Sequence, residues 1–470
     1  LAILLLWLGW LPLPFGSVVE WARVPLMAVP LAIGCVAALL RLYVIRDRTN
    51  TAQPTKAWRI WAFGALLFIA LGALQLVPLP PSLLRAISPE SHAIWSAASQ
   101  VAALGGAAPD ALHPVTVDPP ATAFELARMV ALFATFTAAA LLVRTHGARV
   151  ALATLLCFAA LFETMYGVRE AALQRYAIWG WVNRLIFNRV TGTFVNPNHF
   201  AHYVAIVIPM AVFIGAVAWR RSGPREMPFA RRLVQLVEHR LVPAGFSLIA
   251  TIALAAAVLL AQSRGALLAL AAGAMVVAAL FPGRRVTRIA FGGAAGALVV
   301  LALIVFLGTE RTVARFVPNE FERQTFVGRR VGIAAAAGVW QRFPVLGSGL
   351  GTFQRVVYME QTEDLGKTYH HAHNDYVEIA ATGGAIAFAV AVVSLFWGYA
   401  ALVRMTFGAA AAELSWSRRA FQVAALASLT IAMVHALYDF NFFIPSNPAT
   451  LAAIAGAAMS VTDHDKRTRR

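Results

Sequence analysis

The chain has 470 residues, of which 60% are hydrophobic and only 13% are charged. Its mean hydropathy of +0.69 excludes an ordinary soluble domain and indicates a polytopic membrane protein. The net charge is +17, and we expect much of it to lie in cytoplasmic loops under the positive-inside rule, so no nucleic-acid partner is expected. Cys35 and Cys157 fall inside apolar runs and indicate neither a disulfide framework nor a metal site.

The first half of the chain alternates apolar runs with basic loops. Runs of about 18 to 24 apolar residues are long enough to cross the hydrocarbon core as helices. We predict spans at 1–15, 24–44, 60–77, 123–143 and 151–168, the first broken by prolines. Because the chain starts with Leu, we expect residues before it. We expect no cleaved signal peptide, because more spans follow and no small-residue cleavage site stands out. In the fourth span, Glu125 and Arg128 are spaced to pair on one helix face.

The second half continues the pattern, with predicted spans at 201–219, 244–260, 267–281, 289–307, 377–403, 420–438 and 448–461. The total is about twelve helices with both ends in the cytoplasm. We therefore predict an all-α integral membrane protein of the bacterial inner membrane. Its expected divisions are residues 1–188 (five spans and a periplasmic loop, 78–120), 189–307 (four spans), 308–376 (a periplasmic catalytic loop) and 377–470 (three spans and a cytoplasmic tail).

Two features of the expected periplasmic loop, 308–376, have simple interpretations. Residues 327–342 predict a helix lying on the membrane, with arginines as its polar residues and Trp340 as an interfacial anchor. Residues 347–351, Gly-Ser-Gly-Leu-Gly, look like a nucleotide loop. No strand precedes them, so we predict a plain turn.

The most informative stretch is residues 370–378, which hold three histidines and two carboxylates directly before an apolar span. Ionisable groups at a membrane boundary cost free energy to hold in place, which makes them functional candidates. The alternative interpretation is a solvated loop whose histidines have no role. The expected topology puts further polar residues on the same outer side: Arg189, Asn196, Asn198, His199, Arg264, Arg329, Arg330, Asn374, His435 and Asp439.

The outer location limits the chemistry. Nucleotide-activated donors are confined to the cytoplasm, whereas a polyprenyl diphosphate-linked sugar offers a lipid tail for helices and a diphosphate for arginines. His373 or His371 could take the proton of an attacking hydroxyl, with Asp375 or Glu378 orienting the imidazole. A metal site at the His-x-His pattern is the alternative, but the pattern lacks a distant partner of matching strength.

At these residues the chain resembles the O-antigen ligase and O-antigen polymerase family of bacterial membrane glycosyltransferases. The matching segments are 192–200, 263–265 (Ser-Arg-Gly), 344–353, 371–376 followed by the Thr-Gly-Gly at 382–384, and 435–445. The resemblance implies a GT-C-like helical fold and metal-independent, inverting transfer of a glycan from undecaprenyl diphosphate. It further implies that His373 is the base and that Arg189 and Arg264 bind the diphosphate. Arg329 and Arg330 are further donor-binding candidates because of their expected outer location.

The acceptor is left open, because family members ligate O-antigen to lipid A–core, polymerise repeat units or glycosylate protein hydroxyls. Membrane lipids are expected neighbours, and the oligomeric state is not predicted. A transporter is the alternative class, since twelve helices are common there. Transporters, however, typically show internal repeats, broken helices and polar residues at mid-membrane depth. A scaffold in a polysaccharide assembly complex is the third interpretation.

Overall fold

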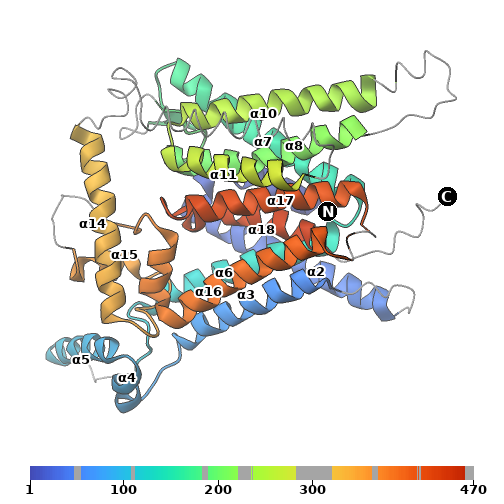
Figure 1. The fold of residues 1–470 in the computed structure, drawn as a ribbon. Coiled ribbons are helices and arrows are strands. Elements are labelled where there is room, and N and C mark those ends of the chain that lie inside the picture. The colour runs from blue at the N-terminus through green and yellow to red at the C-terminus, as the bar shows by residue number, and fades with distance from the viewer. Residues whose placement is uncertain are drawn as a thin grey trace.

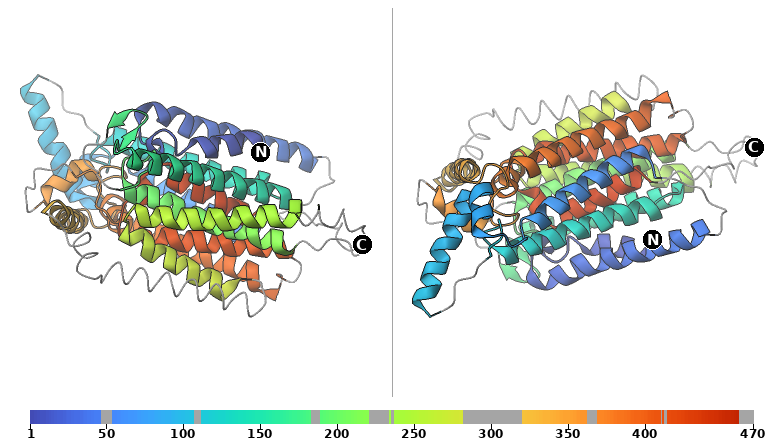
Figure 2. Two further views of the ribbon diagram at one scale, coloured as in Figure 1. Left: turned by 90° about the horizontal axis from the view of Figure 1, so that it is seen from above. Right: turned by 90° about the horizontal axis from the view of Figure 1, so that it is seen from below.

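The computed structural model describes residues 1–46, 54–106, 112–182, 189–220, 234, 237–281, 320–361, 369–409, 411 and 414–460. Within these ranges, long helices lie side by side in one bundle, and one helix, α14 (Glu320–Arg342), crosses an end of it (Figure 1 and Figure 2). Seven of the described helices are long and apolar enough to cross a membrane. The predicted all-α membrane class is confirmed.

The helices fall into an N-terminal and a C-terminal set. The first set is α1 (Ala2–Trp10), α2 (Arg23–Arg46), α3 (Lys56–Leu74), α4 (Pro81–Ile87), α5 (Pro89–Leu104), α6 (Pro119–Leu142) and α7 (His146–Ala172). The second set is α8 (Pro197–Arg220), α10 (Val242–Leu260), α11 (Arg264–Leu280), α14, α15 (Phe353–Val356), α16 (Asp375–Phe407), α17 (Trp416–His435) and α18 (Ser446–Ala458). A two-stranded antiparallel hairpin, β1 (Ala177–Ile178) and β2 (Trp181–Val182), links the two sets.

Each predicted span has a helix at its position except 289–307, which lies outside the described residues. Two of these helices, α1 and α18, have 9 and 13 residues and are shorter than the roughly 20 residues that a full crossing needs. The predicted pair of Glu125 and Arg128 is confirmed, with Arg128 Nε donating to Glu125 Oε2 at 2.9 Å inside α6.

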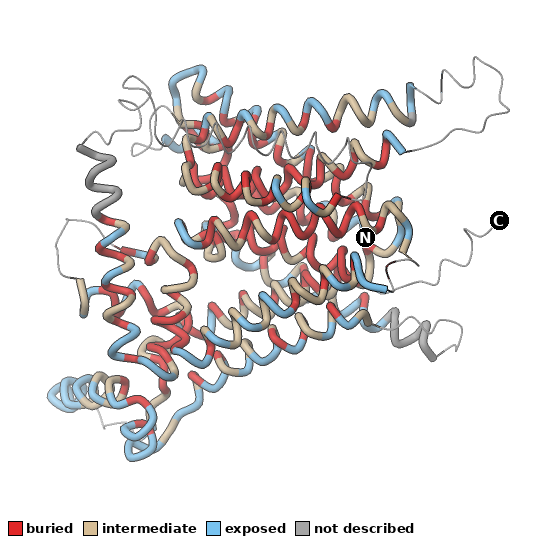
Figure 3. The backbone as a smooth tube through the Cα atoms, in the orientation of Figure 1, coloured by how far each residue is buried: buried red, intermediate tan, exposed pale blue. Residues whose placement is uncertain are grey.

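Helix α8 lies at the centre of the bundle, where buried residues dominate (Figure 3). It packs against α7, α10 and α17, and 83% of its 18-residue apolar stretch is buried inside the protein. A helix that is apolar on all sides is buried either in a protein core or in a membrane, and here the neighbouring helices bury most of α8. The N-terminus of α8 is therefore held rigidly, and the side chains at that end form part of the candidate site.

Helix α16 is broken at Gly384, which has φ +72° and ψ 178°. The break frees backbone groups, and a turn formed by residues 344–349 satisfies them. Ser348 N donates to Ala381 O at 3.2 Å, and Ala385 N donates to Pro344 O at 2.9 Å. Irregular backbone at membrane depth is tolerated where protein covers it in this way.

The turn at residues 347–351 therefore supports α16, in agreement with its interpretation as a plain turn. Gln75, at the end of α3, fixes the same place by donating its Nε2 to Thr382 O at 3.0 Å. Broken helices are common in transporters. Here, however, the turn's own backbone groups satisfy the break, and Gln75 adds a further bond.

Candidate functional site

The loop before α16 is joined to the end of α17 by hydrogen bonds. The Asn374 side chain caps α16 by accepting from Tyr376 N at 3.0 Å and Val377 N at 3.1 Å. Its Nδ2 donates to Leu437 O at 3.1 Å, and Asp375 N donates to Ala436 O at 3.0 Å. The residues on either side of Asn374 are therefore held against the turn that follows α17.

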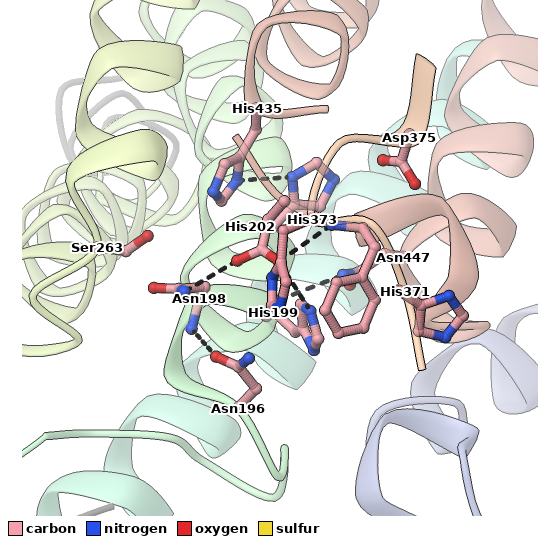
Figure 4. A network of polar contacts seen from close by, with 12 residues as sticks. Asn196, Asn198, His199, His202, Ser263, His371, His373, Asp375, His435 and Asn447 are labelled. Carbon is pink, nitrogen blue, oxygen red and sulfur yellow. Dashed lines mark hydrogen bonds and ion pairs between the residues drawn. The ribbon is translucent and has the colours of Figure 1, made fainter. Parts of the chain in front are cut away.

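Asp439, in that turn, is the centre of a polar network that includes Asn198, His199 and His373, which Figure 4 labels. Its Oδ1 lies 2.9 Å from His373 Nδ1, and its Oδ2 accepts from Asn198 Nδ2 at 2.9 Å. Arg329 NH2, from α14, donates to the same Oδ2 at 3.2 Å. One buried carboxylate thus connects α14, the α16 loop, the α17 turn and the start of α8.

These contacts determine the charge of Asp439. Burial alone would raise its pKa, but the positive charge of Arg329 and the contacts with His199 and His373 outweigh burial and hold the pKa well below its usual range. His199 Nε2 lies 3.8 Å from Asp439 Oδ1, which is an ion-pair distance rather than a hydrogen bond. Asp439 is therefore ionised at neutral pH.

His373 has an unusual backbone conformation, with φ +55°. Left-handed conformations are uncommon for residues other than glycine and persist where the surroundings fix them. The His373 ring also packs edge-on against Phe440, with ring centres 4.8 Å apart. Phe440 contacts His199 and His371 as well, at 4.5 and 4.4 Å. This phenylalanine thus brings three imidazoles together.

His371 has a carboxylate partner of its own. Its Nδ1 lies 2.8 Å from Glu378 Oε1, and Glu378 Oε2 accepts from Ala372 N at 2.8 Å. Since Glu378 is 1% exposed, it is committed to holding this loop. The two candidate bases therefore each have one buried carboxylate at Nδ1.

The start of α8 brings Arg189 into the network. Asn196 caps this helix, with its Oδ1 accepting from Asn198 N at 2.9 Å. Asn198 then bridges two charges, because its Oδ1 accepts from Arg189 NH2 at 3.0 Å while its Nδ2 binds Asp439. Arg189 also donates from Nε to Ala261 O at 2.9 Å. It thereby holds the turn that leads into α11.

That turn carries Arg264, the first residue of α11, after the N-cap Ser263. The next residue, Gly265, lies so close to His435 that a Cβ there would be 2.9 Å from the His435 ring. His435 Nδ1 in turn lies 3.0 Å from His202 Nδ1, and both rings are buried. The segment with Arg264 therefore packs directly on the helix that leads to Asp439.

Asp375 and Arg330 are among the predicted residues that do not contact Asp439. Asp375 faces another way, accepting from Phe442 N at 3.3 Å, and the carboxylate partner of His373 is Asp439. The reason is local, because Asp375 is the first residue of α16 and the helix fixes the direction of its side chain. Arg330, which follows Arg329 on α14, is exposed.

The sequence analysis did not single out His202, Phe440 or Asn447. His202 lies three residues after His199 on α8, and this i, i+3 spacing is a signal that both face one side of the helix. Asn447 Nδ2 donates to His199 O at 3.3 Å. Among the described residues, no three His, Cys, Asp or Glu side chains are grouped as metal ligands would be.

One of the comparisons with known proteins gives a family match. Residues 249–392 match the family model described as O-antigen ligase, and this range contains Arg264, Arg329, His371 and His373. A search of curated proteins finds no match. The resemblance of the chain to the O-antigen ligase and polymerase family of membrane glycosyltransferases is thereby confirmed.

Proposed function

We propose that the chain transfers a glycan from undecaprenyl diphosphate to an acceptor hydroxyl at the periplasmic face of the bacterial inner membrane, without a metal and with inversion. This proposal includes the twelve-span, GT-C-like topology with both ends in the cytoplasm. It also includes the divisions at 1–188, 189–307, 308–376 and 377–470. The observation on which it depends is the 2.9 Å contact of His373 Nδ1 with the buried, ionised Asp439.

The acceptor half of the reaction follows from this contact. A carboxylate at Nδ1 favours the tautomer with its proton on Nδ1, which leaves the lone pair on Nε2. The His373 side chain is 26% exposed, so its ring is accessible on one side. His373 Nε2 takes the proton of the acceptor hydroxyl while the hydroxyl oxygen bonds to the anomeric carbon.

The donor half requires cations where the diphosphate departs. As the new bond forms, the bond from the anomeric carbon to the phosphate oxygen breaks, and its electron pair stays on the diphosphate. Arg329 is suited to receive this charge, because its side chain is 31% exposed and its Nε has no hydrogen-bond partner among the described residues. Arg189, Arg264 and Arg330 are the other proposed donor-binding residues.

The test is substitution of the base with a matched control on the same loop. We expect His373→Ala to lower transfer from a polyprenyl diphosphate-linked glycan by about 10²- to 10⁴-fold, the usual contribution of a general base. His370→Ala removes an exposed imidazole three residues away and should leave the rate unchanged. His371→Ala shows which ring is the base. Normal transfer by a folded His373→Ala protein would exclude the mechanism.

Ligation to lipid A–core and repeat-unit polymerisation are equally compatible with this geometry, and so is transfer to protein hydroxyls. The three reactions share the donor half of the site and differ in the acceptor. Assaying one donor with a lipid A–core, a second lipid-linked repeat unit and a hydroxyl-bearing peptide separates them.

A further inference from the structure

A groove of about 620 Å³ lies between α3 and α16, away from the histidines. The two helices are antiparallel here, because Gly64 packs on Ser394 and Gly398 packs on Trp61. The end of α3 that binds Thr382 is near the break in α16, whereas the groove includes the start of α3. The groove therefore lies in the half of the bundle opposite the Asp439 network.

Charge is concentrated at one end of this groove. Lys56 and Arg59, one turn apart at the start of α3, line it together with Phe63 and Leu67 further along the same helix face. The described lining contains no Asp or Glu. Neither basic side chain has a carboxylate partner within the described parts of the chain. An anionic group would complete this end of the groove.

Apart from Ser394, the remainder of the groove is lined by apolar residues, and it is open to the surroundings. Phe63 is 70% exposed, and Trp397, on the α16 side, is 58% exposed. Lys56 and Leu67 are eleven residues apart, which is about 16 Å along a helix. This length is close to half of the roughly 30 Å hydrocarbon core. The groove is thus as long as an acyl chain of one leaflet.

Two glycines beside the groove hold α3 and α16 close together. A Cβ on Gly398 would overlap the Trp61 ring, and one on Gly64 would overlap Ser394, so the backbones approach closely only because both residues are glycine. A groove between two closely packed helices, with an apolar wall and a cationic end, matches a molecule with one charged head and flexible tails.

We propose that this groove binds an anionic phospholipid, with its phosphate at Lys56 and Arg59 and an acyl chain along Phe63, Leu67 and Trp397. The site is separate from the glycan-transfer site, at the other end of α16. The phosphate gains from two adjacent cations, and a zwitterionic head group gains less because its own ammonium opposes them.

The test compares two lipids with the same acyl chains, palmitoyl-oleoyl phosphatidylglycerol and palmitoyl-oleoyl phosphatidylcholine, on the purified full chain by native mass spectrometry. We expect phosphatidylglycerol to be retained about tenfold better, with the preference lost in Lys56→Gln/Arg59→Gln. Arg404→Gln removes an exposed charge at the end of α16, outside the groove lining, and should keep the preference. Val390→Trp fills the groove and should lower retention of both lipids.

Three results would overturn the proposal. Equal retention of the two lipids by the wild type would remove the charge selectivity. An unchanged preference in the double variant would assign the selectivity to other residues. A dimer that Val390→Trp dissociates would assign the groove to a second copy of the chain. Because none of these measurements uses glycan transfer, failure here is distinguishable from failure of the proposed function.

Discussion

Replacing Asp439 by Asn tests the network most directly, because every described partner of this carboxylate is, or can be, a donor. Oδ1 of Asp439 is contacted by Phe440 N and His373 Nδ1. Oδ2 accepts from Asn198 Nδ2 and from Arg329 Nη2. An amide offers one acceptor oxygen and one donor nitrogen. In either orientation of the side-chain amide that Asp439→Asn creates, its NH2 group therefore faces donors.

Neither orientation of the amide fits without the loss of a contact or a change of tautomer. Asn198 cannot turn its oxygen toward the new amide, because that oxygen accepts from Arg189 at 3.0 Å. If the NH2 group faces His373 instead, the imidazole must accept at Nδ1 and carry its proton on Nε2, which removes the lone pair needed by a base. The substitution thus either breaks the contacts to Asn198 and Arg329 or produces the wrong tautomer of His373.

The size of the effect follows from these contacts. Removing one partner of a buried ion pair costs about 3–5 kcal/mol, and the 31% exposure of the Arg329 side chain places the cost at the lower end. For transfer, loss of the correct tautomer removes general-base catalysis, about 10²- to 10⁴-fold. We expect Asp439→Asn to show both effects, measured by thermal unfolding in detergent and by consumption of a polyprenyl diphosphate-linked glycan.

Asp118→Asn is the matched control. Asp118 pairs with Arg355 at 2.9 Å, but the Arg355 side chain is 72% exposed, and such pairs contribute about 1 kcal/mol or less. Asp118 also caps α6, which Asn does equally well. If Asp439→Asn is folded and transfers at the rate of Asp118→Asn, the role given to the carboxylate is refuted.

Two further predictions concern the break in α16 and the pH dependence of the network. Gly384→Ala places a Cβ 2.3 Å from Val345 O at a φ of +72°, so we expect it to lower the free energy of unfolding by at least about 3 kcal/mol. The control is Gly147→Ala, which has open space around it and should be nearly neutral. Thermal unfolding measures both effects. The folded-state pKa of Asp439 is depressed by Arg329, so its contribution to stability is complete above the unfolded value of about 3.9 and is lost as pH falls through the lower folded value. The difference in Tm between wild type and Asp439→Asn should then be constant from about pH 5 to 8 and shrink only below about pH 4; shrinkage already at about pH 6 would contradict the depressed pKa.

The sequence was sufficient for the long apolar helices because apolar runs determine them locally, but it did not predict α4 and α5, which lie in the expected loop 78–120. The sequence analysis named Asn374 and Asn196 only as outer polar residues, although a helix cap has a local signal because it depends on residues two or three positions away. The sequence analysis expected Asp375 or Glu378 as the carboxylate that orients the imidazole, whereas the partner of His373 in the structure is Asp439. Asp375 is near His373 in sequence, but Asp439, 66 residues away, is near it in space. No local pattern encodes a contact that depends on how two helices end.

The same limit applies to the break at Gly384. The Thr-Gly-Gly sequence at 382–384 suggests flexibility. Whether a break is tolerated, however, depends on which groups form hydrogen bonds with the freed backbone. Here those groups belong to residues 344–349, whose glycines adopt conformations that other residues avoid. A shift of this turn would move the first turns of α16, and with them Asn374 and the His373 loop.

The link between the turn at 344–349, α16 and the His373 loop explains why the Asp439 network needs the helix bundle around it. Asp439 remains charged while buried because donors from four segments surround it, and each segment is fixed elsewhere: α8 by packing on all sides, α16 by the turn at 344–349, and α14 and α17 by their own contacts. A base that must present Nε2 in one orientation requires this rigidity, since a misplacement of about 1 Å costs as much as 10²-fold in rate. The apolar bundle therefore contributes to the proposed reaction by fixing the positions of His373 and Asp439.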